Sequence, residues 1–522
     1  MIAKIFDLED IFMTLLAFIL YFALILGIGL FFFFRSKNAG EKEYFLGGRS
    51  MGPWVTAMSA QASDMSGWLL MGFPGSIIAF GMGKVWIGIG LALGTAANWI
   101  FVAKRLRRFS RAAGDSITLP QYLTNRFASK SPVLKIICAV IFLISFTVYV
   151  ASSFVAGKNV MCAVIPWFQG KEILAVGVFA LLILIYTFLG GYKAVCWTDF
   201  FQGLMMLVAL LAVPIIMFLG KSDTAFQGAF AEGVTAFGTN PFTAQWQDIV
   251  TGLSWGLGYF GMPHIIVRFM AIEKPSMVKK SATVAIVWVV LTLGAAIAMA
   301  IIGRTYLLPD GSSLAAALLP AGAQQNIFIV VVQALFPGFV AGLLLAAIVA
   351  AAMSTADSQL LVASSAFSSD LYKPIIRKNK ASDKEMLWVA RLVVLIVAIV
   401  AFFIATSGTS WAGSIMAMVE NAWGLFGAAF GPVVILSLFW KRLNYTGAVA
   451  GILAGAAVDI AWILLFTDTI IPAVVKPTGI YEILPGFVAG LIAAVAVSLV
   501  TKAPGAEVEA IVASALDTSV DD

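Results

Sequence analysis

The sequence predicts an all-α polytopic membrane protein with about thirteen transmembrane helices. The first observation is composition: 61% of the 522 residues are hydrophobic, 11% are charged, and the mean hydropathy is +0.98, a combination typical of membrane proteins. The second is a series of apolar runs, each long enough (about 20 residues) to cross a bilayer as a helix. The third is the placement of Lys and Arg, which gather in alternate loops between these runs.

The apolar runs define the expected helices in chain order. They cover residues 11–34, 54–80, 84–106, 132–164, 172–190, 195–219, 247–272, 280–304, 325–365, 386–407, 411–440, 446–467 and 482–501. The loops after the first and third runs are strongly basic, so we expect both to face the cytoplasm. Alternation then places the N-terminus outside and the C-terminus inside, with the acidic cytoplasmic tail 503–522 fraying into solvent.

The second run is interrupted at its centre. Between Ala62 and Gly67 the chain combines a carboxylate, Asp64, with serines that compete for backbone hydrogen bonds. We therefore expect a broken transmembrane helix. Non-helical backbone at membrane depth is stable only where it is buried in protein or lines a watery cavity, and its freed carbonyls can coordinate a cation. Asp64 marks the position of that cavity.

The seventh run is also predicted to be broken, because it contains four glycines and a proline between Gly252 and His264. Two broken helices five runs apart, one opening each half, are typical of transporters with inverted repeats of five helices. We expect one repeat over residues 46–220 and a second over 245–442. The first helix with its loop (1–45) and the last two helices (443–502) would be peripheral.

Several functions are excluded by residue types. The net charge of +6 comes from short loops beside apolar runs, so it is a topology signal and not a nucleic-acid surface. Cys138, Cys162 and Cys196 lack paired spacing, and His264 is the single histidine, which argues against a disulfide framework or a zinc site. No nucleophile with a base is present, so we expect no enzyme activity. We infer no protein partner; the lipid bilayer and a small molecule are the expected partners.

Six motifs carry a resemblance to a known family. They are Tyr44–Pro53, Ser63–Gly72, Gly190–Asp199, Trp255–His264, Ala352–Thr355 and Phe426–Pro432. In these motifs, and along nearly the whole chain, the sequence resembles the sodium:solute symporters, most closely the branch that transports proline. The resemblance implies the leucine-transporter-type fold, alternating access about a fixed midplane site, and sodium-coupled uptake of L-proline across a bacterial inner membrane.

The resemblance also implies ligands for the coupling ion, sodium. They would be the backbone carbonyls of Ala62, Met65 and Ala351 and the hydroxyls of Ser354 and Thr355. Independently, about five or six neutral oxygens suit a hard cation, and residues four apart on a helix share one face. The alternative is that both hydroxyls only satisfy carbonyls of their own helical turn.

Charged residues extend this expected site. The resemblance links Asp64 and Asp199 to cation handling and Arg49 to loop function and gating. Asp199 has an alternative role as an interfacial partner of Lys193, which lies close by in the sequence. The alternative for Asp64 is a structural charge paired with a basic residue or backbone amides, and Arg49 could equally be one more positive-inside residue.

Two acids depart from the proline branch. Asp357 stands where that branch has no acid, as in branches that take sugars or organic acids, and Glu420 is a second extra acid in the eleventh run. Either could support cation handling, contact the substrate or be protonated. A sodium symporter for another small solute, such as an organic acid, a sugar or a different amino acid, is therefore the alternative function.

For the substrate, the resemblance implies a set of residues from three runs. The set is Ser66, Trp68, Tyr149, Trp255, Tyr259 and Pro263. Proline is a small zwitterion, so aromatic rings can hold its apolar ring and ammonium group while a broken helix end takes the carboxylate. The alternative for each aromatic residue is ordinary helix packing or an interfacial belt.

Overall fold

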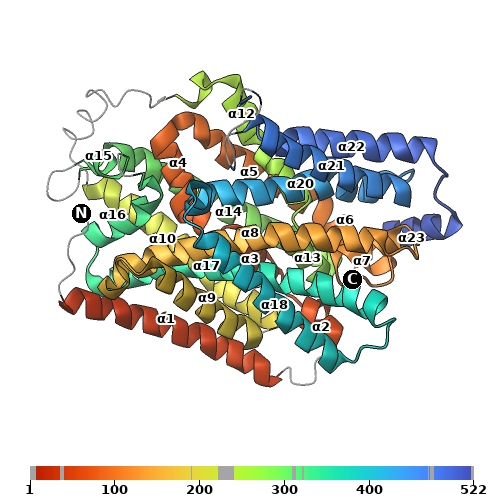
Figure 1. Cartoon of the computed structure of the whole chain (residues 1–522), viewed down its shortest axis with the longest axis horizontal. Helices are drawn as coiled ribbons and strands as arrows, with labels where there is room; N and C mark the ends of the chain where they lie inside the picture. Colours follow the sequence, from red (N-terminus) through yellow and green to blue (C-terminus); the bar gives the residue numbers. More distant parts are fainter. Residues whose placement is uncertain are drawn as a thin grey trace.

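The computed structural model describes residues 8–35, 40–189, 191–220, 240–307, 313–319, 322–467, 470, 475 and 477–518. This described part is helical and contains no strand, and its long helices lie broadly along one common axis (Figure 1). Ten of its helices are long and apolar enough to cross a membrane. The two broken helices and the shorter α9 account for the remaining predicted runs, so the predicted all-α membrane fold is confirmed.

The helices are numbered as in Figure 1. They are α1 (Leu8–Arg35), α2 (Glu41–Leu46), α3 (Pro53–Asp64), α4 (Phe73–Phe80), α5 (Val85–Ala97), α6 (Lys104–Ala112), α7 (Leu119–Arg126), α8 (Val133–Val164), α9 (Glu172–Leu189), α10 (Tyr192–Gly220), α12 (Trp246–Ser254), α13 (Pro263–Ala271), α14 (Val278–Thr305), α15 (Leu314–Leu318), α16 (Ile327–Leu335), α17 (Gly338–Ser365), α18 (Asp383–Ala405), α19 (Ser410–Gly413), α20 (Ile415–Phe439), α21 (Tyr445–Phe466), α22 (Ile483–Val500) and α23 (Ala506–Leu516).

The second predicted helix is broken at the expected place. α3 ends at Asp64, and Met65 leaves the helical conformation with φ −83° and ψ 77°. The amide of Ser66 donates to the Asp64 carbonyl (3.0 Å), so it is not available to the carbonyl of Ala62. The chain resumes as a π-helical turn over Trp68–Gly72 that leads directly into α4.

The seventh predicted helix is broken as well. α12 is followed by a 3-10 helix, Trp255–Phe260, and α13 then begins with a proline, whose missing amide costs nothing at a helix start. The glycines permit backbone contact with α5. A Cβ added to Gly256 would lie 2.5 Å from the Gly90 carbonyl oxygen, and one added to Gly94 would lie 2.4 Å from the Gly256 carbonyl oxygen.

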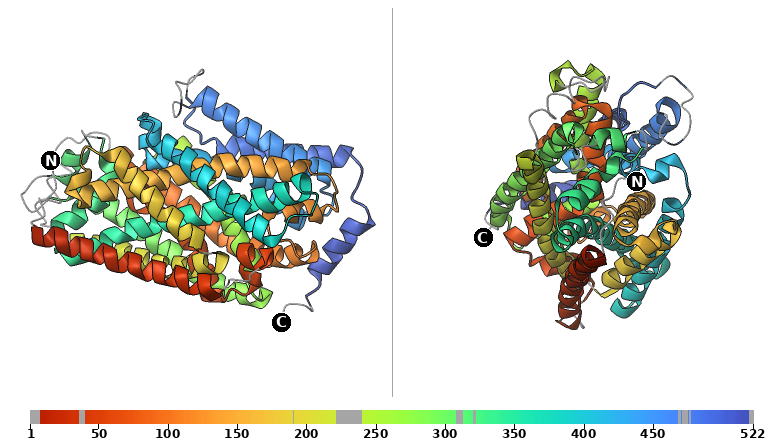
Figure 2. Two further views of the ribbon diagram at one scale, coloured as in Figure 1. Left: turned by 60° about the horizontal axis from the view of Figure 1, so that its bottom comes forward. Right: turned by 90° about the vertical axis from the view of Figure 1, so that its left-hand side faces the viewer.

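The middle of the molecule is formed by helices buried on all sides. Every residue of α17 from Leu344 to Ser365 is buried, and this helix contacts α3, α8, α10 and α13. α1 packs against α17 and α10 on one side, while α21 and α22 pack on each other and on α20 along the opposite side (Figures 1 and 2). The breaks in the two helices therefore lie between inner helices, with Asp64, Trp68, Trp255 and Tyr259 buried.

Two expectations about helix extent are wrong. The run 325–365 is not one helix, because Phe336 is extended and Pro337 cannot continue the hydrogen bonding of α16, so α17 starts anew. The acidic tail does not fray over its whole length. Residues 506–516 form α23, which buries Val508, Val512 and Ala515 and contacts α6. Residues 519–522 and Gly190 lie outside the described residues.

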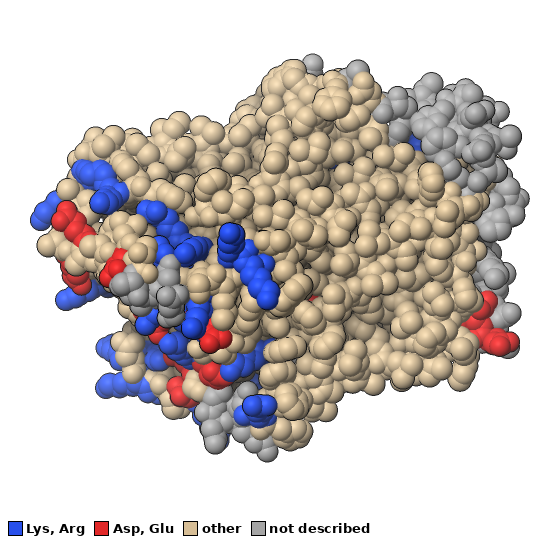
Figure 3. Space-filling model, turned by 180° about the vertical axis from the view of Figure 1, so that it is seen from behind, with Lys and Arg blue, Asp and Glu red and all other residues tan. Residues whose placement is uncertain are grey.

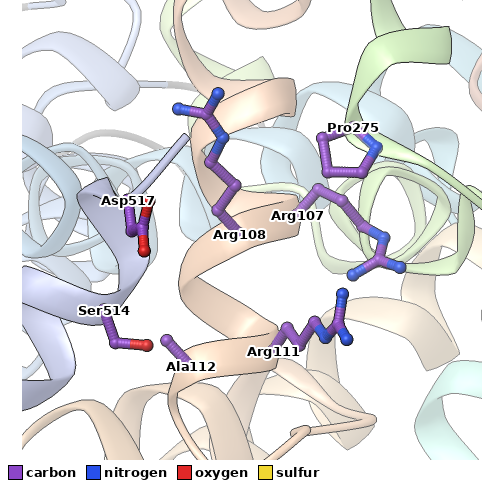
Figure 4. Close-up of a pocket in the computed structure, with 7 residues that line it drawn as sticks. All are labelled: Arg107, Arg108, Arg111, Ala112, Pro275, Ser514 and Asp517. Atoms are coloured by element: carbon purple, nitrogen blue, oxygen red, sulfur yellow. The ribbon is translucent and has the colours of Figure 1, made fainter. Parts of the chain in front are cut away.

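Lys and Arg gather at one end of the molecule, which we call the basic end (Figure 3). A cavity of about 300 Å³ opens there, lined by Arg107, Arg108, Arg111, Ala112, Pro275, Ser514 and Asp517. Figure 4 shows the arginines on α6 between the tail helix and the segment that holds Pro275. The tail helix thus covers a basic face of α6, and this cavity is distinct from the region of the helix breaks.

We expect Gly256→Ala to destabilise the fold, because the new methyl group would meet backbone atoms of α5 that cannot move aside. Overpacking of this kind costs about 1–3 kcal/mol, which thermal unfolding of the purified protein in detergent would show as a lower midpoint. Gly294→Ala in α14 is the control, since its new Cβ meets nothing within 4 Å. Equal midpoints for the two variants would contradict the close crossing.

Candidate ion and substrate site

The elements expected to hold sodium meet at the break of α3. The Ser354 hydroxyl of α17 donates to the Ala62 carbonyl (2.8 Å), and its oxygen lies 3.2 Å from the Ala351 carbonyl oxygen. Thr355 is fully buried, and its hydroxyl oxygen has no hydrogen-bond partner in the described part of the chain. Met65 is the first residue after the end of α3 and has a non-helical backbone conformation. Ala62 and Met65 thus border the break and Ser354 bonds across it, whereas Ala351 and Thr355 lie within one turn of Ser354 in α17.

This arrangement fits a sodium ion. Carbonyl and hydroxyl oxygens are the neutral ligands that a hard monovalent cation takes, and the donor set is fully dehydrated by burial. The unpartnered oxygen of Thr355 is a buried polar atom whose cost is relieved when a cation binds beside it. Because Ser354 and Thr355 lie on a straight stretch of α17, a bound ion would join this helix to the broken end of α3.

Asp64 lies at the centre of the expected aromatic set. Its carboxylate oxygen Oδ2 accepts a hydrogen bond from Tyr259 Oη (2.6 Å). Its backbone carbonyl accepts from Trp68 Nε1 (3.3 Å) and from Tyr149 Oη (3.4 Å). All four residues are at most 2% exposed. One residue of the break therefore connects α3, α8 and the 3-10 helix 255–260.

The aromatic rings continue from the break toward α20 and α22. The Trp255 ring centroid lies 6.4 Å from that of Trp68 and 5.0 Å from that of Tyr481. Trp423 of α20 donates its indole hydrogen to the Trp255 carbonyl (2.9 Å) and meets the Tyr259 ring edge-on at 5.0 Å. The expected set is thus brought together, and it is joined by Trp423 and Tyr481, which no motif in the sequence had indicated.

Ser66 and Pro263 have more limited contacts. Ser66 Oγ accepts from the amide of Trp68 (3.4 Å) and so helps to restart the chain after the break. Pro263 is buried at the first position of α13. His264, next to it, packs against the rings of Phe146 and Tyr149, and neither of its ring nitrogens has a hydrogen-bond partner among the described residues. The lone histidine is a packing residue.

Asp199 does not pair with Lys193. Its carboxylate instead forms a fully buried ion pair with Arg268 of α13 (3.0 Å), while Lys193 pairs with Glu43 (2.5 Å). The interfacial pair offered above as the alternative role of Asp199 is therefore wrong, because α13 supplies a nearer cation. Sequence reasoning missed Arg268, although a single arginine inside an apolar run is itself a signal of a functional or paired charge.

The Arg268 guanidinium is the hub of a polar network between four helices. It donates to Ser59 Oγ of α3 (3.1 Å) and to Ser358 Oγ of α17 (2.6 Å). Ser59 in turn donates to the Asp199 carboxylate of α10 (2.7 Å). Asp357, also fully buried, accepts from Ser358 Oγ (3.3 Å), so the extra acid of α17 lies beside this network.

Arg49 is 7% exposed and joins three segments at the basic end. It pairs with Asp115 (2.8 Å), donates to Ser110 and to the Ser116 carbonyl (2.8 Å), and donates to the Met270 carbonyl near the end of α13. Burial lowers the pKa of its guanidinium, and the Asp115 carboxylate opposes that shift. The loop before α3 is thereby tied to the α6–α7 link and to α13.

Glu420 lies apart from the oxygen cluster at Thr355. It is near the start of α20, and its backbone carbonyl accepts from Tyr481 Oη (2.7 Å). It therefore belongs to the aromatic end of the site, toward α22. The extra acids of the sequence, Asp357 and Glu420, have different surroundings.

A broken helix that meets α17 at an oxygen cluster and meets a second broken helix at an aromatic cluster defines a secondary transporter of the leucine-transporter-type fold. A structure titled as a substrate-bound, outward-open Na⁺-coupled sialic acid symporter matches with a TM-score of 0.73 at 21% identity, over 94% of this chain and 99% of that chain. At this identity the likeness shows the fold alone.

The family is given by sequence comparison. The sodium:solute symporter family model matches residues 44–455. Sodium/proline symporter 2 of Staphylococcus saprophyticus is 43% identical over 505 residues, which are 94% of each chain. The sodium/proline symporter of Staphylococcus aureus strain JH9 is 42% identical, over 94% of this chain and 93% of its own. The chain belongs to the sodium:solute symporter family. It is a sodium-coupled transporter and not an enzyme.

Removing the Arg268 charge should be costly. In Arg268→Gln the Asp199 carboxylate would stay buried without its partner, which typically costs about 3–5 kcal/mol, so we expect a strongly lowered thermal midpoint. Adding Asp199→Asn should recover part of that loss, because the unpaired charge disappears. A double variant as unstable as the sum of the single variants would contradict the assignment of this pair.

Proposed function

We propose that this protein takes up L-proline together with sodium by alternating access. The proposal is carried by 42–43% identity over nearly the whole chain to relatives named sodium/proline symporters. The geometry supports it, since an oxygen cluster suited to sodium and an aromatic cluster suited to a small zwitterion with an apolar ring meet at one break. Proline as the particular solute is our inference.

In this proposal sodium binds between α3 and α17. The carbonyls of Ala62, Met65 and Ala351 and the hydroxyls of Ser354 and Thr355 would be its ligands. The bound ion would supply a positive charge that compensates the freed carbonyls at the break. When the ion leaves, Ser354 and Ala62 can satisfy each other directly, as their hydrogen bond allows.

Proline would bind on the other side of the break. Trp68, Trp255 and Tyr259 offer ring faces for the pyrrolidine ring and its ammonium group, which cation–π attraction favours. Tyr149 and Ser66 offer hydroxyls at the broken end, and Pro263 starts a helix whose N-terminal amides favour a carboxylate. Asp64 would hold the aromatic hydroxyls in place and only indirectly support the ion.

The basic end and the Arg49 hydrogen bonds indicate how the protein would be oriented in the membrane and how its cytoplasmic side would be closed. The basic end of the molecule would face the cytoplasm, which puts the N-terminus outside and the C-terminus inside. The Arg49 network would then close the cytoplasmic side, because it ties the loop before α3 to α13 and to the α6–α7 link. Opening inward would require these hydrogen bonds to break together.

Uptake by the purified protein in proteoliposomes tests the function. With one neutral site we expect one sodium, and thus one positive charge, per proline. A tenfold sodium gradient supplies about 1.4 kcal/mol and 100 mV about 2.3 kcal/mol per charge, enough for accumulation of several hundredfold. A panel of amino acids, organic acids and sugars is the control. Preferred uptake of an organic acid or a sugar, or two charges per solute, would contradict the proposal. Asp357 would then be the first residue to test as a substrate contact or as part of a second cation site.

Thr355→Ala tests the ion site. Loss of one ligand oxygen in a dry site costs about 1–3 kcal/mol, so we expect the sodium concentration for half-maximal uptake to rise roughly tenfold or more. Thr355→Ser keeps the hydroxyl and is the matched control, which should stay near the wild type. An unchanged sodium curve in Thr355→Ala would remove this residue from the site.

A further inference from the structure

Two carboxylic acids are buried together outside the site described above. Asp459 lies in α21 and is 0% exposed, and Glu482 directly precedes α22 and is 2% exposed. Among the described residues, neither carboxylate oxygen of Asp459 has a hydrogen-bond partner. Glu482 Oε1 accepts from the Asn421 amide of α20 (2.7 Å). Asp459 is therefore a buried carboxyl group whose hydrogen-bonding capacity is unused.

The two acids flank the same stretch of bare backbone. A Cβ added to Gly424 of α20 would lie 3.1 Å from Asp459 Oδ1 and 3.2 Å from Glu482 Cγ. A Cβ added to Gly486 of α22 would lie 3.1 Å from the Asp459 Cβ. The glycines thus allow α20, α21 and α22 to bring both carboxyl groups to one place.

The elements packed around the pair present no cation to it. α20 contributes Glu420 and Asn421 to the surroundings of the pair. The segment before α22 contributes Tyr481, whose hydroxyl donates a hydrogen bond to the Glu420 carbonyl of α20. Lys84, in the 3-10 turn before α5, is paired with Asp248 of α12 (3.2 Å). Among the described residues, no ion pair involves Asp459 or Glu482. Two ionised carboxylates at this depth would repel each other without compensation.

We propose that Asp459 and Glu482 form a proton-binding site, separate from the sodium site, in which the pair retains one proton. Two adjacent buried carboxyl groups that cannot both ionise share a proton in other proteins, and the unused oxygens of Asp459 provide the acceptor for it. The site would be specific for a proton, because the pair and one amide offer too few oxygens for a dehydrated metal cation.

The position of the pair connects it to the proposed solute site, and this part rests on the proposed function. Tyr481, next to Glu482, packs against Trp255 with ring centroids 5.0 Å apart and the rings tilted by 33°. Loss of the shared proton would add a negative charge behind this ring pair and loosen the packing of α22 on α20. Solute uptake should then fall as the pH of the outer solution rises.

Thermal unfolding of the purified full-length chain tests the proton site without any transport. A proton bound by the folded pair and released by the unfolded chain makes stability fall as pH rises. We expect the wild-type midpoint to fall as the pH rises from about 4, the ordinary pKa of a carboxyl group in an unfolded chain, up to the pKa of the folded pair, and then to level off. The fall should be smaller in Asp459→Asn and in Glu482→Gln, in which the replaced group is permanently neutral. Glu172→Gln is the matched control and should keep the wild-type slope, because Glu172 of α9 pairs with Lys158 (3.7 Å) and α9 packs on α8 and α18.

Wild-type slopes in both neutral variants would overturn the proposal. So would a loss of one bound ²²Na⁺ per protein in Asp459→Asn with an unchanged pH profile, because the pair would then hold sodium. If Asp459→Asn does not fold, Glu482→Gln alone decides the question. Failure to transport proline would leave these unfolding slopes unaffected, so the proton site and the proposed function fail separately.

Discussion

The interruption of α3 between Asp64 and Gly67 is the constraint on which the rest of the site depends. Backbone groups released at membrane depth must find partners, because no water is available in the bilayer core. The Ala62 carbonyl finds Ser354 of α17, and the Asp64 carbonyl finds Trp68 and Tyr149. One break thus supplies an oxygen cluster on one side and an aromatic cluster on the other, within a few residues of chain.

Buried charge is handled in two different ways in this fold. Asp199 is compensated by Arg268 in a network that joins α3, α10, α13 and α17. The Asp459–Glu482 pair has no such cation among the described residues and, in our proposal, carries one proton, which leaves only one of the two carboxylates charged. The Asp199–Arg268 ion pair holds its helices together through opposite charges. The proposed shared proton would instead make the packing of α22 on α20 depend on pH.

The all-α membrane class and the two breaks could be predicted from local composition, since glycines, serines and a proline act on the backbone where they stand, whereas the leucine-transporter-type fold was implied by the family resemblance. The aromatic set and the hydroxyls of α17 came from the family resemblance. Residues whose role depends on distant partners could not be found in this way: Arg268, Trp423 and Tyr481 meet the site only through packing. The tail helix α23 was not predicted, because the acidic residues of the tail indicated a solvent-exposed segment although Val508, Val512 and Ala515 form a short apolar stripe.

The central claim is that sodium and solute share the break of α3, and reciprocal binding tests it most directly. Calorimetry on the purified protein would measure the dissociation constant for proline with and without saturating sodium, and that for sodium with and without proline. Thermodynamic linkage predicts the same factor in both directions, and a coupling of about 1–3 kcal/mol corresponds to about 5–150-fold. Proline that binds equally well with and without sodium would contradict the shared site.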